Sequence, residues 1–262
     1  YEMSASLVGS EMCIRDRDGS IEFRDVSFKY RADAAEDVLE HIDLRIESGS
    51  TVGILGGTGS GKSSLVQLIA RLYDATEGAV LVGGRDVRDY DLAALRDAVG
   101  IVLQKNVLFT GTVRENLQWG NPQASDDELL AACRAACVDE FLDRIGGLDG
   151  ELGQGGAGVS GGQKQRLCIA RTLALNPDVI LFDEPCSALD PISTLAIEDL
   201  MSSIVADRAI VIVTHNMEQA SRVSNRTAFF YMGDMVEYDE TDEIFQRPKD
   251  KRLNDYLTGM FS

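Results

Sequence analysis

A glycine-rich run between an apolar stretch and a helix places the strongest constraint on the fold of this chain. The run reads GGTGSGKSS at 56–64, follows TVGIL at 51–55, and precedes SSLVQLIARLY, which has apolar residues at helical spacing. The spacing Gly56-x-x-x-x-Gly61-Lys62-Ser63 is that of a phosphate-binding loop. A strand before the loop and a helix after it are the context that this motif requires. The sequence therefore predicts a phosphate site where a buried strand meets a helix.

Each part of the loop has a chemical reason. Glycines let successive backbone N–H groups converge on phosphate oxygens, and the helix adds its positive N-terminal end. We expect Lys62 to bridge the β- and γ-phosphates and the Ser63 hydroxyl to bind Mg²⁺, which prefers oxygen ligands. The alternative, a glycine-rich turn that binds nothing, is disfavoured because strand, lysine and helix occur together. The residues predicted to hold the phosphates are Gly56, Gly57, Thr58, Gly59, Ser60, Gly61, Lys62, Ser63 and Ser64.

Acidic residues and a histidine follow two further apolar stretches. Asp183 and Glu184 end VILFDE, and His215 ends AIVIVTH. We expect Asp183 to hold the Mg²⁺ shell and Glu184 to polarise the attacking water. The carboxyl ends of parallel strands lie at one edge of a sheet, so His215 is predicted to contact the γ-phosphate. The alternative interpretations are a solvated acidic turn and a structural histidine.

The order of apolar and helical stretches predicts an α/β fold with a mostly parallel sheet. SIEFRDVSFKY, read as a strand pair or one bent strand, and HIDLRI predict an N-terminal antiparallel β-subdomain. About 105–160 is interpreted as an inserted helical subdomain, in which SDDELLAACRAACVDEFLDRI reads as helix with Cys133 and Cys137 on one face. Two short helices, broken at Pro248, are expected within about 240–262.

Composition excludes some partners. A net charge of -18 argues against nucleic-acid binding, which needs clustered Lys and Arg. No apolar run approaches the roughly 20 residues needed to span a bilayer. Five scattered cysteines without metal-site spacing suggest a reducing cytosol. Residues 1–17 show no period, and we expect a non-native or disordered stretch, with the folded domain in 18–262.

The segment VSGGQKQR at 159–166 resembles the signature motif of ABC-transporter ATPase subunits, and with the other motifs the resemblance covers about 19–262. It implies a P-loop NTPase core that binds ATP and Mg²⁺ and hydrolyses ATP in a head-to-tail dimer. ATP would lie between the phosphate loop of one subunit and Ser160, Gly161, Gly162 and Gln163 of the other. SGGQKQRLCIARTLA also reads as a helix whose N-terminus can face phosphate.

The resemblance implies roles for other single residues. Tyr30 matches the aromatic that stacks on adenine, although a strand-end tyrosine is the alternative. Gln104 matches the glutamine that links Mg²⁺ and the attacking water to the helical insertion. Ser187 to Asp190 match the loop that touches the opposite subunit. The catalytic set implied is Lys62, Gln104, Glu184 and His215, the magnesium set is Ser63, Gln104 and Asp183, and Asp190 joins the nucleotide contacts.

Two branches of the family are visible in the chain. Residues 19–166 resemble the nucleotide domains of exporters, whereas 167–262 resemble the ATPase subunit of the bacterial phosphate importer. We hypothesise that the chain is a chimera joined within the shared segment, by sequence assembly or recombination. The resemblance implies the motor subunit of a transporter, with import of phosphate as one candidate transport activity. It also implies transmembrane permease subunits as partners and a peripheral location on the cytoplasmic face of the inner membrane. The alternatives are an exporter-type domain, a non-transport ABC ATPase, or a binding-only module that never hydrolyses.

Overall fold

A computed structural model describes residues 19–34, 36–105, 107–187, 189–205 and 208–260. The expectation for residues 1–17 therefore lies outside the described residues.

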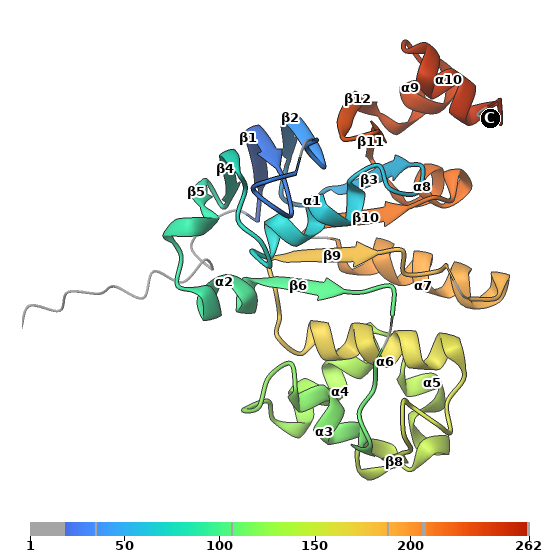
Figure 1. Ribbon diagram of the computed structural model, residues 1–262. Coiled ribbons are helices and arrows are strands. Elements are labelled where there is room, and N and C mark those ends of the chain that lie inside the picture. Colours follow the sequence, from blue (N-terminus) through green and yellow to red (C-terminus); the bar gives the residue numbers. More distant parts are fainter. Residues whose placement is uncertain (1–18, 35, 106, 188, 206–207, 261–262) are drawn as a thin grey trace, which may run out of the picture.

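A six-stranded sheet in the order β12-β11-β3-β10-β9-β6 forms the centre of the molecule (Figure 1). Five of its strands (β11, β3, β10, β9 and β6) run parallel to one another, and β12 runs antiparallel to β11. The strands are β3 (Thr51–Gly56), β6 (Val99–Val102), β9 (Val179–Asp183), β10 (Ala209–Thr214), β11 (Arg226–Tyr231) and β12 (Asp234–Glu240). Every residue of β3, β9 and β10 is buried, because both faces of the sheet are covered, which explains their nearly continuous apolar sequences.

A second, antiparallel sheet packs beside the first and confirms the predicted N-terminal β-subdomain. Its order is β2-β1-β4-β5, with β1 (Ile21–Phe28), β2 (Leu39–Ile46), β4 (Glu77–Val82) and β5 (Arg85–Asp86). The pairing of β1 with β2 shifts register between Phe23 and Val26, where Asp25 has a φ of 48°. The stretch is therefore one bent strand with a bulge and not a strand pair.

Alternate residues of the central strands face two different cores. Val179 and Leu181 of β9 pack with the antiparallel sheet and α1 (Lys62–Ile69), whereas Ile180 and Phe182 pack with the opposite helices. This division follows from the two-residue period of a strand. The helices α2 (Leu92–Ala98), α7 (Pro191–Ile204) and α8 (Met217–Val223) complete the α/β domain, with a 3₁₀ turn at Val87–Asp89.

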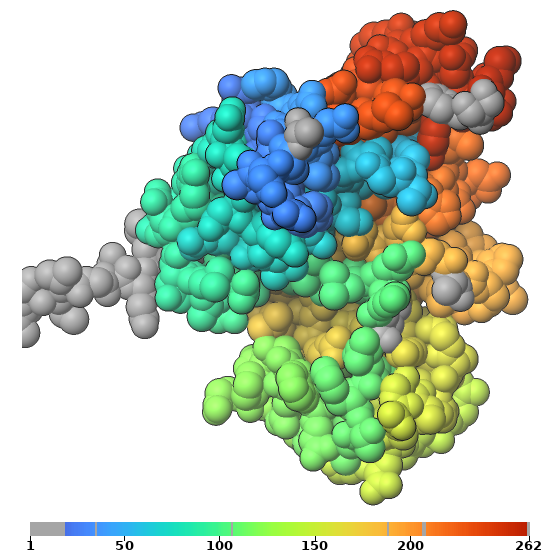
Figure 2. All heavy atoms as spheres, in the orientation of Figure 1, coloured from blue at the N-terminus to red at the C-terminus, as the bar shows by residue number. Residues whose placement is uncertain are grey.

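The inserted part is helical and lies below β6 in Figure 1, and Figure 2 shows it in green and yellow-green at the bottom of the molecule. It contains α3 (Val113–Gln118), α4 (Asp126–Ala135), α5 (Asp139–Leu142), 3₁₀ turns at Asp143–Ile145 and Gly147–Asp149, and the short pair β7 (Gly111–Thr112) and β8 (Glu151–Leu152). The following helix α6 (Gly161–Leu173) packs on α3, α4 and β6, so it joins the insertion to the sheet.

The expectation of one helix through Cys133 and Cys137 is wrong. Helix α4 ends at Ala135, and Cys137 has a φ of 52°, outside the helical region. Cys133 is buried in the core, and Cys137 is only partly buried beyond the helix end.

The last described segment holds α9 (Thr241–Gln246) and α10 (Lys251–Leu257), with Pro248 between them. Ile244 and Leu253 from these helices pack with Leu55, Ala220 and Phe229 in a third apolar cluster. In the described ranges, none of the helices is both long enough and apolar enough to cross a bilayer.

Candidate nucleotide-binding site

The glycine run forms a loop between β3 and α1 whose lysine is turned back onto it. Lys62 Nζ donates to the carbonyl oxygens of Gly56 at 2.9 Å and Gly57 at 2.6 Å, and to Ser60 Oγ at 3.4 Å. Burial lowers the pKa of the Lys62 ammonium, although Glu184 and Asp183 oppose that shift. The ammonium group thus donates its hydrogen bonds to oxygen atoms of the loop itself, while Glu184 and Asp183 lie close enough to influence its pKa. An anion in the loop would give this charge a stronger partner.

The first residue of α1 after the lysine meets the end of β9. Ser63 Oγ donates to Asp183 Oδ1 at 3.1 Å. Burial raises the pKa of the Asp183 carboxyl, and the hydrogen bond from Ser63 opposes the rise. A hydroxyl and a carboxylate side by side are hard oxygen donors that suit Mg²⁺. These two residues fit the predicted magnesium set, and a bound cation would offset the cost of burying the carboxylate.

Glu184 is held by residues from two other strand ends. Its Oε2 lies 3.2 Å from Gln104 Nε2 and 3.2 Å from His215 Nδ1. Gln104 follows β6 by two residues, and His215 follows β10 directly. Glu184 itself has a φ of 48°, a left-handed conformation that costs a non-glycine residue on the order of 1–3 kcal/mol. Because β6, β9 and β10 are adjacent in the sheet, three distant segments converge on one carboxylate.

Tyr30 lies at the other side of the loop and is half exposed. Its hydroxyl is 2.8 Å from Ser64 Oγ and donates to Gln67 Oε1 at 3.0 Å. Its ring packs edge-on against Phe28 and Tyr73. Sequence reasoning named Tyr30 and Ser64 but missed Gln67, which was detectable as the residue three positions after Ser64 on the same helix face.

These residues surround one open cavity. It has a volume of about 590 Å³ and extends from the phosphate loop to Tyr30 and to Glu184, Gln104 and His215, which we call the Glu184 group. Its lining residues are Tyr30, Val38, Thr58, Gly59, Ser60, Gly61, Lys62, Ser63, Ser64, Gln104, Glu184 and His215. Val38, at the start of the segment leading into β2, was not anticipated.

The signature residues lie elsewhere in the chain. Ser160 caps α6, with Ser160 Oγ accepting from the Gln163 backbone at 3.3 Å and Gln163 Oε1 accepting from the Ser160 backbone at 2.9 Å. Asp190 caps α7 by accepting hydrogen bonds from the backbone N–H groups of Ile192 and Ser193. In the part of the chain described, Ser160, Gly161, Gly162, Gln163 and Asp190 are not among the residues that line the cavity.

Comparison with known proteins agrees with this geometry. The family model described as "ABC transporter" matches residues 39–187. A solved structure of a bacterial Atm1-family ABC exporter with ATP bound is similar to this chain, with a TM-score of 0.84 and 33% sequence identity. The match covers 94% of this chain and 42% of that chain, so this chain spans less than half of the exporter chain. The matched range holds both the glycine loop and the Asp183–Glu184 pair, and the chain belongs to the ABC transporter family as an ATP-binding subunit or domain.

Proposed function

We propose that this chain hydrolyses ATP and drives a transporter with that energy. The observation that supports this best is the cavity in which a phosphate loop faces Glu184, Gln104 and His215. A site that only bound nucleotide would not need three strand ends to meet at one carboxylate. The proposed reaction is attack of water on the γ-phosphate of ATP.

In this proposal the loop amides and Lys62 hold the phosphates, and the Tyr30 ring stacks on the adenine. Ser63, Asp183 and Gln104 hold Mg²⁺, which neutralises charge on the phosphate oxygens when it is bound. Glu184 polarises the water. His215, beside the same carboxylate oxygen at 3.2 Å, orients Glu184 and reaches the γ-phosphate.

A second subunit completes the site in this proposal. Ser160, Gly161, Gly162 and Gln163 start α6 with a capped N-terminus, whose first N–H groups suit a phosphate. Since they do not line their own chain's cavity, they would act on the cavity of a partner in a head-to-tail dimer. Asp190 would contact the same partner through the loop before α7.

An apolar groove is the proposed permease contact. Phe109 and Trp119 stack with ring centroids 4.4 Å apart, and Trp119 is 66% exposed. With Leu72 and Ile101 they line a cavity of about 320 Å³ between the sheet and the insertion. Exposed apolar patches of this kind mark interaction sites. The groove adjoins the segment after Gln104, so an occupant could influence the Glu184 group. We place the chain peripherally on the cytoplasmic face of the inner membrane because the family resemblance implies transmembrane partners there.

The assignment of phosphate as an imported cargo rests only on the resemblance of residues 167–262 to the ATPase subunit of the phosphate importer. The similar solved structure is that of an exporter. The transmembrane component that associates with this chain is the part that would bind the cargo. Transport assays on that complex, with phosphate as the first solute tried, would identify cargo and direction.

The test of hydrolysis uses purified protein and phosphate release. Glu184→Gln is expected to lower kcat by roughly 10²–10⁴-fold while retaining ATP binding and forming an ATP-dependent dimer on a sizing column. His215→Ala is expected to lower activity, and His41→Ala, which changes the exposed histidine of β2, is the matched control. Activity that is indifferent to Lys62→Ala would refute the proposed site. Failure of Glu184→Gln to dimerise with ATP would refute the two-subunit arrangement.

The test of the groove compares two exposed apolar residues. Trp119→Glu is expected to abolish stimulation of ATPase activity by the permease, whereas Met232→Glu, at a residue 75% exposed on another surface, is expected to leave it unchanged. Equal stimulation of both variants would refute the proposed contact.

A further inference from the structure

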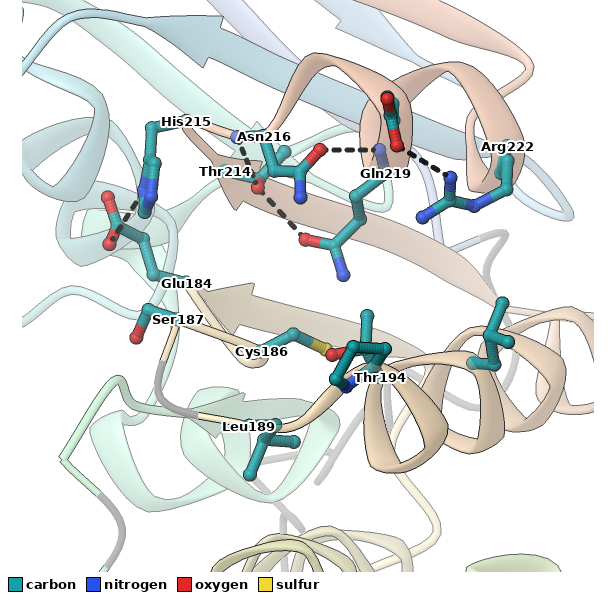
Figure 3. Close-up of a pocket in the computed structure, with 13 residues that line it drawn as sticks. Glu184, Cys186, Ser187, Leu189, Thr194, Thr214, His215, Asn216, Gln219 and Arg222 are labelled. Atoms are coloured by element: carbon teal, nitrogen blue, oxygen red, sulfur yellow. Dashed lines mark hydrogen bonds and ion pairs between the residues drawn. The ribbon is translucent and has the colours of Figure 1, made fainter.

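A buried polar network lies behind the Glu184 group, in a part of the molecule that the proposed mechanism does not use. Gln219 of α8 is 2% exposed, and Glu198 of α7 is 5% exposed. Buried polar side chains are costly unless they are hydrogen bonded. The network extends along a cavity of about 490 Å³ between α7 and α8, shown in Figure 3.

Gln219 is bonded at both ends of its side chain. Its Oε1 accepts from Thr214 Oγ1 at 2.9 Å, and its Nε2 donates to Glu198 Oε1 at 3.4 Å. Its backbone N–H donates to Asn216 Oδ1 at 3.0 Å, and the Asn216 backbone donates in turn to Thr214 Oγ1 at 3.0 Å. Figure 3 shows Thr214, Asn216 and Gln219 joined in this way at the end of β10. The segment that contains His215 is thereby fixed on both of its sides.

Glu198 connects this group to α7. Arg222 donates to it through two nitrogens, Nε to Oε2 at 2.7 Å and Nη2 to Oε1 at 2.9 Å. A two-point pair between a guanidinium and a carboxylate restricts orientation as well as distance. The Glu198 carboxylate is therefore a fixed support for Gln219. Because α7 begins directly after Asp190, the same helix carries the loop proposed to touch the second subunit.

The cavity beside the network also reaches the segment after Glu184. Cys186 lies two residues beyond it, and burial raises the pKa of the Cys186 thiol to about 11. Gln219 and Thr194 oppose that rise. Gln219 thus bonds to the residue just before His215 and lines the same cavity as Cys186, which lies just after Glu184.

We propose that Gln219, supported by Glu198 and Arg222, is a positioning residue that sets the spacing of Glu184 and His215 through Thr214. This inference rests on the proposed function, since it concerns the residues assigned there to hydrolysis. Reacting groups displaced by about 1 Å can lose on the order of 10²-fold in rate. A support bonded to the residues on both sides of His215, Thr214 and Asn216, would prevent such a displacement.

The test removes the hydroxyl group of Thr214 while the volume of the side chain stays nearly the same. Thr214→Val removes the hydroxyl, Thr214→Ser keeps it, and Ser221→Ala removes an exposed hydroxyl from α8 as the control. Thr214→Val is expected to lower kcat at least about tenfold, with KM for ATP within about twofold and an altered pH profile of kcat. Thr214→Ser and Ser221→Ala are expected to match wild type. Rates are normalised to the folded fraction, measured by binding of a fluorescent ATP analogue.

A second variant covers the case in which Thr214→Val does not fold. The Arg222 side chain is 43% exposed, so Arg222→Lys keeps the charge and removes the two-point pair at small cost to folding. It is expected to lower kcat several-fold at unchanged KM. Wild-type kcat in both Thr214→Val and Arg222→Lys, or an equal fall in Thr214→Ser, would overturn the inference. Wild-type protein that hydrolyses no ATP would instead overturn the proposed function.

Discussion

The phosphate loop contains two glycines, Gly57 and Gly61, at which the same substitution is expected to change stability by different amounts. Gly61 precedes α1 with a φ of 93°, and a Cβ there would lie 2.6 Å from the Val38 carbonyl oxygen and 2.7 Å from Leu39 Cδ2. Gly57, in contrast, does not have a positive φ, and a Cβ there would meet nothing within 4 Å. Comparing Gly61→Ala with Gly57→Ala therefore tests whether the positive φ and the close packing at Gly61 require a glycine there.

The expected difference can be calculated from two terms. A left-handed conformation costs an alanine roughly 1–2 kcal/mol. Overpacking against a backbone carbonyl and a core leucine adds roughly 1–3 kcal/mol. Both variants restrict the unfolded chain equally, by about 0.4–1 kcal/mol, so that contribution cancels between them. Gly61→Ala should thus be about 2–5 kcal/mol less stable than Gly57→Ala, which should equal or slightly exceed wild type.

The assay is urea unfolding without nucleotide, so that any effect on phosphate binding is excluded. The slope of the free energy against urea should be unchanged, because the surface exposed on unfolding is the same. Two variants within about 1 kcal/mol of each other would refute the reasoning about close packing at Gly61.

Three further predictions concern binding. Lys62→Ala is expected to weaken ATP binding roughly 10–150-fold, the equivalent of one charge-assisted bond of about 1.5–3 kcal/mol, with Lys251→Ala as a calorimetric control. Tyr30→Ala should raise the ATP dissociation constant roughly 5–150-fold through lost stacking, whereas Tyr30→Phe should nearly retain affinity; equal losses would assign the effect to the hydroxyl. Burial raises the pKa of Asp183, so its charged form costs stability, and the penalty develops as pH rises above the ordinary value of 3.8. Asp183→Asn should therefore stabilise the nucleotide-free protein at pH 7, lose that advantage as pH falls toward 4, and gain less from Mg²⁺ and ATP in thermal unfolding.

Local sequence patterns were sufficient to predict the buried strands, the phosphate loop and the fold class of this protein. The apolar runs at β3, β9 and β10 were readable because both faces of those strands are buried, which removes the usual alternation. The loop at 56–64 was readable because glycines, lysine and the flanking elements are contiguous in sequence. The fold class followed from the order of such segments.

Tertiary structure decided which of these segments meet. Gln104 lies 80 residues before Glu184, and only the strand order that puts β6 beside β9 brings their side chains to 3.2 Å. The break at Cys137 depends on a positive φ that helical periodicity does not reveal. Gln219 and Glu198 read as ordinary polar residues of two helices, and their burial is set by the packing of α7 against α8. Periodicity reports the environment of a residue along its own element, whereas strand order, register and helix packing are fixed by contacts between elements far apart in the chain.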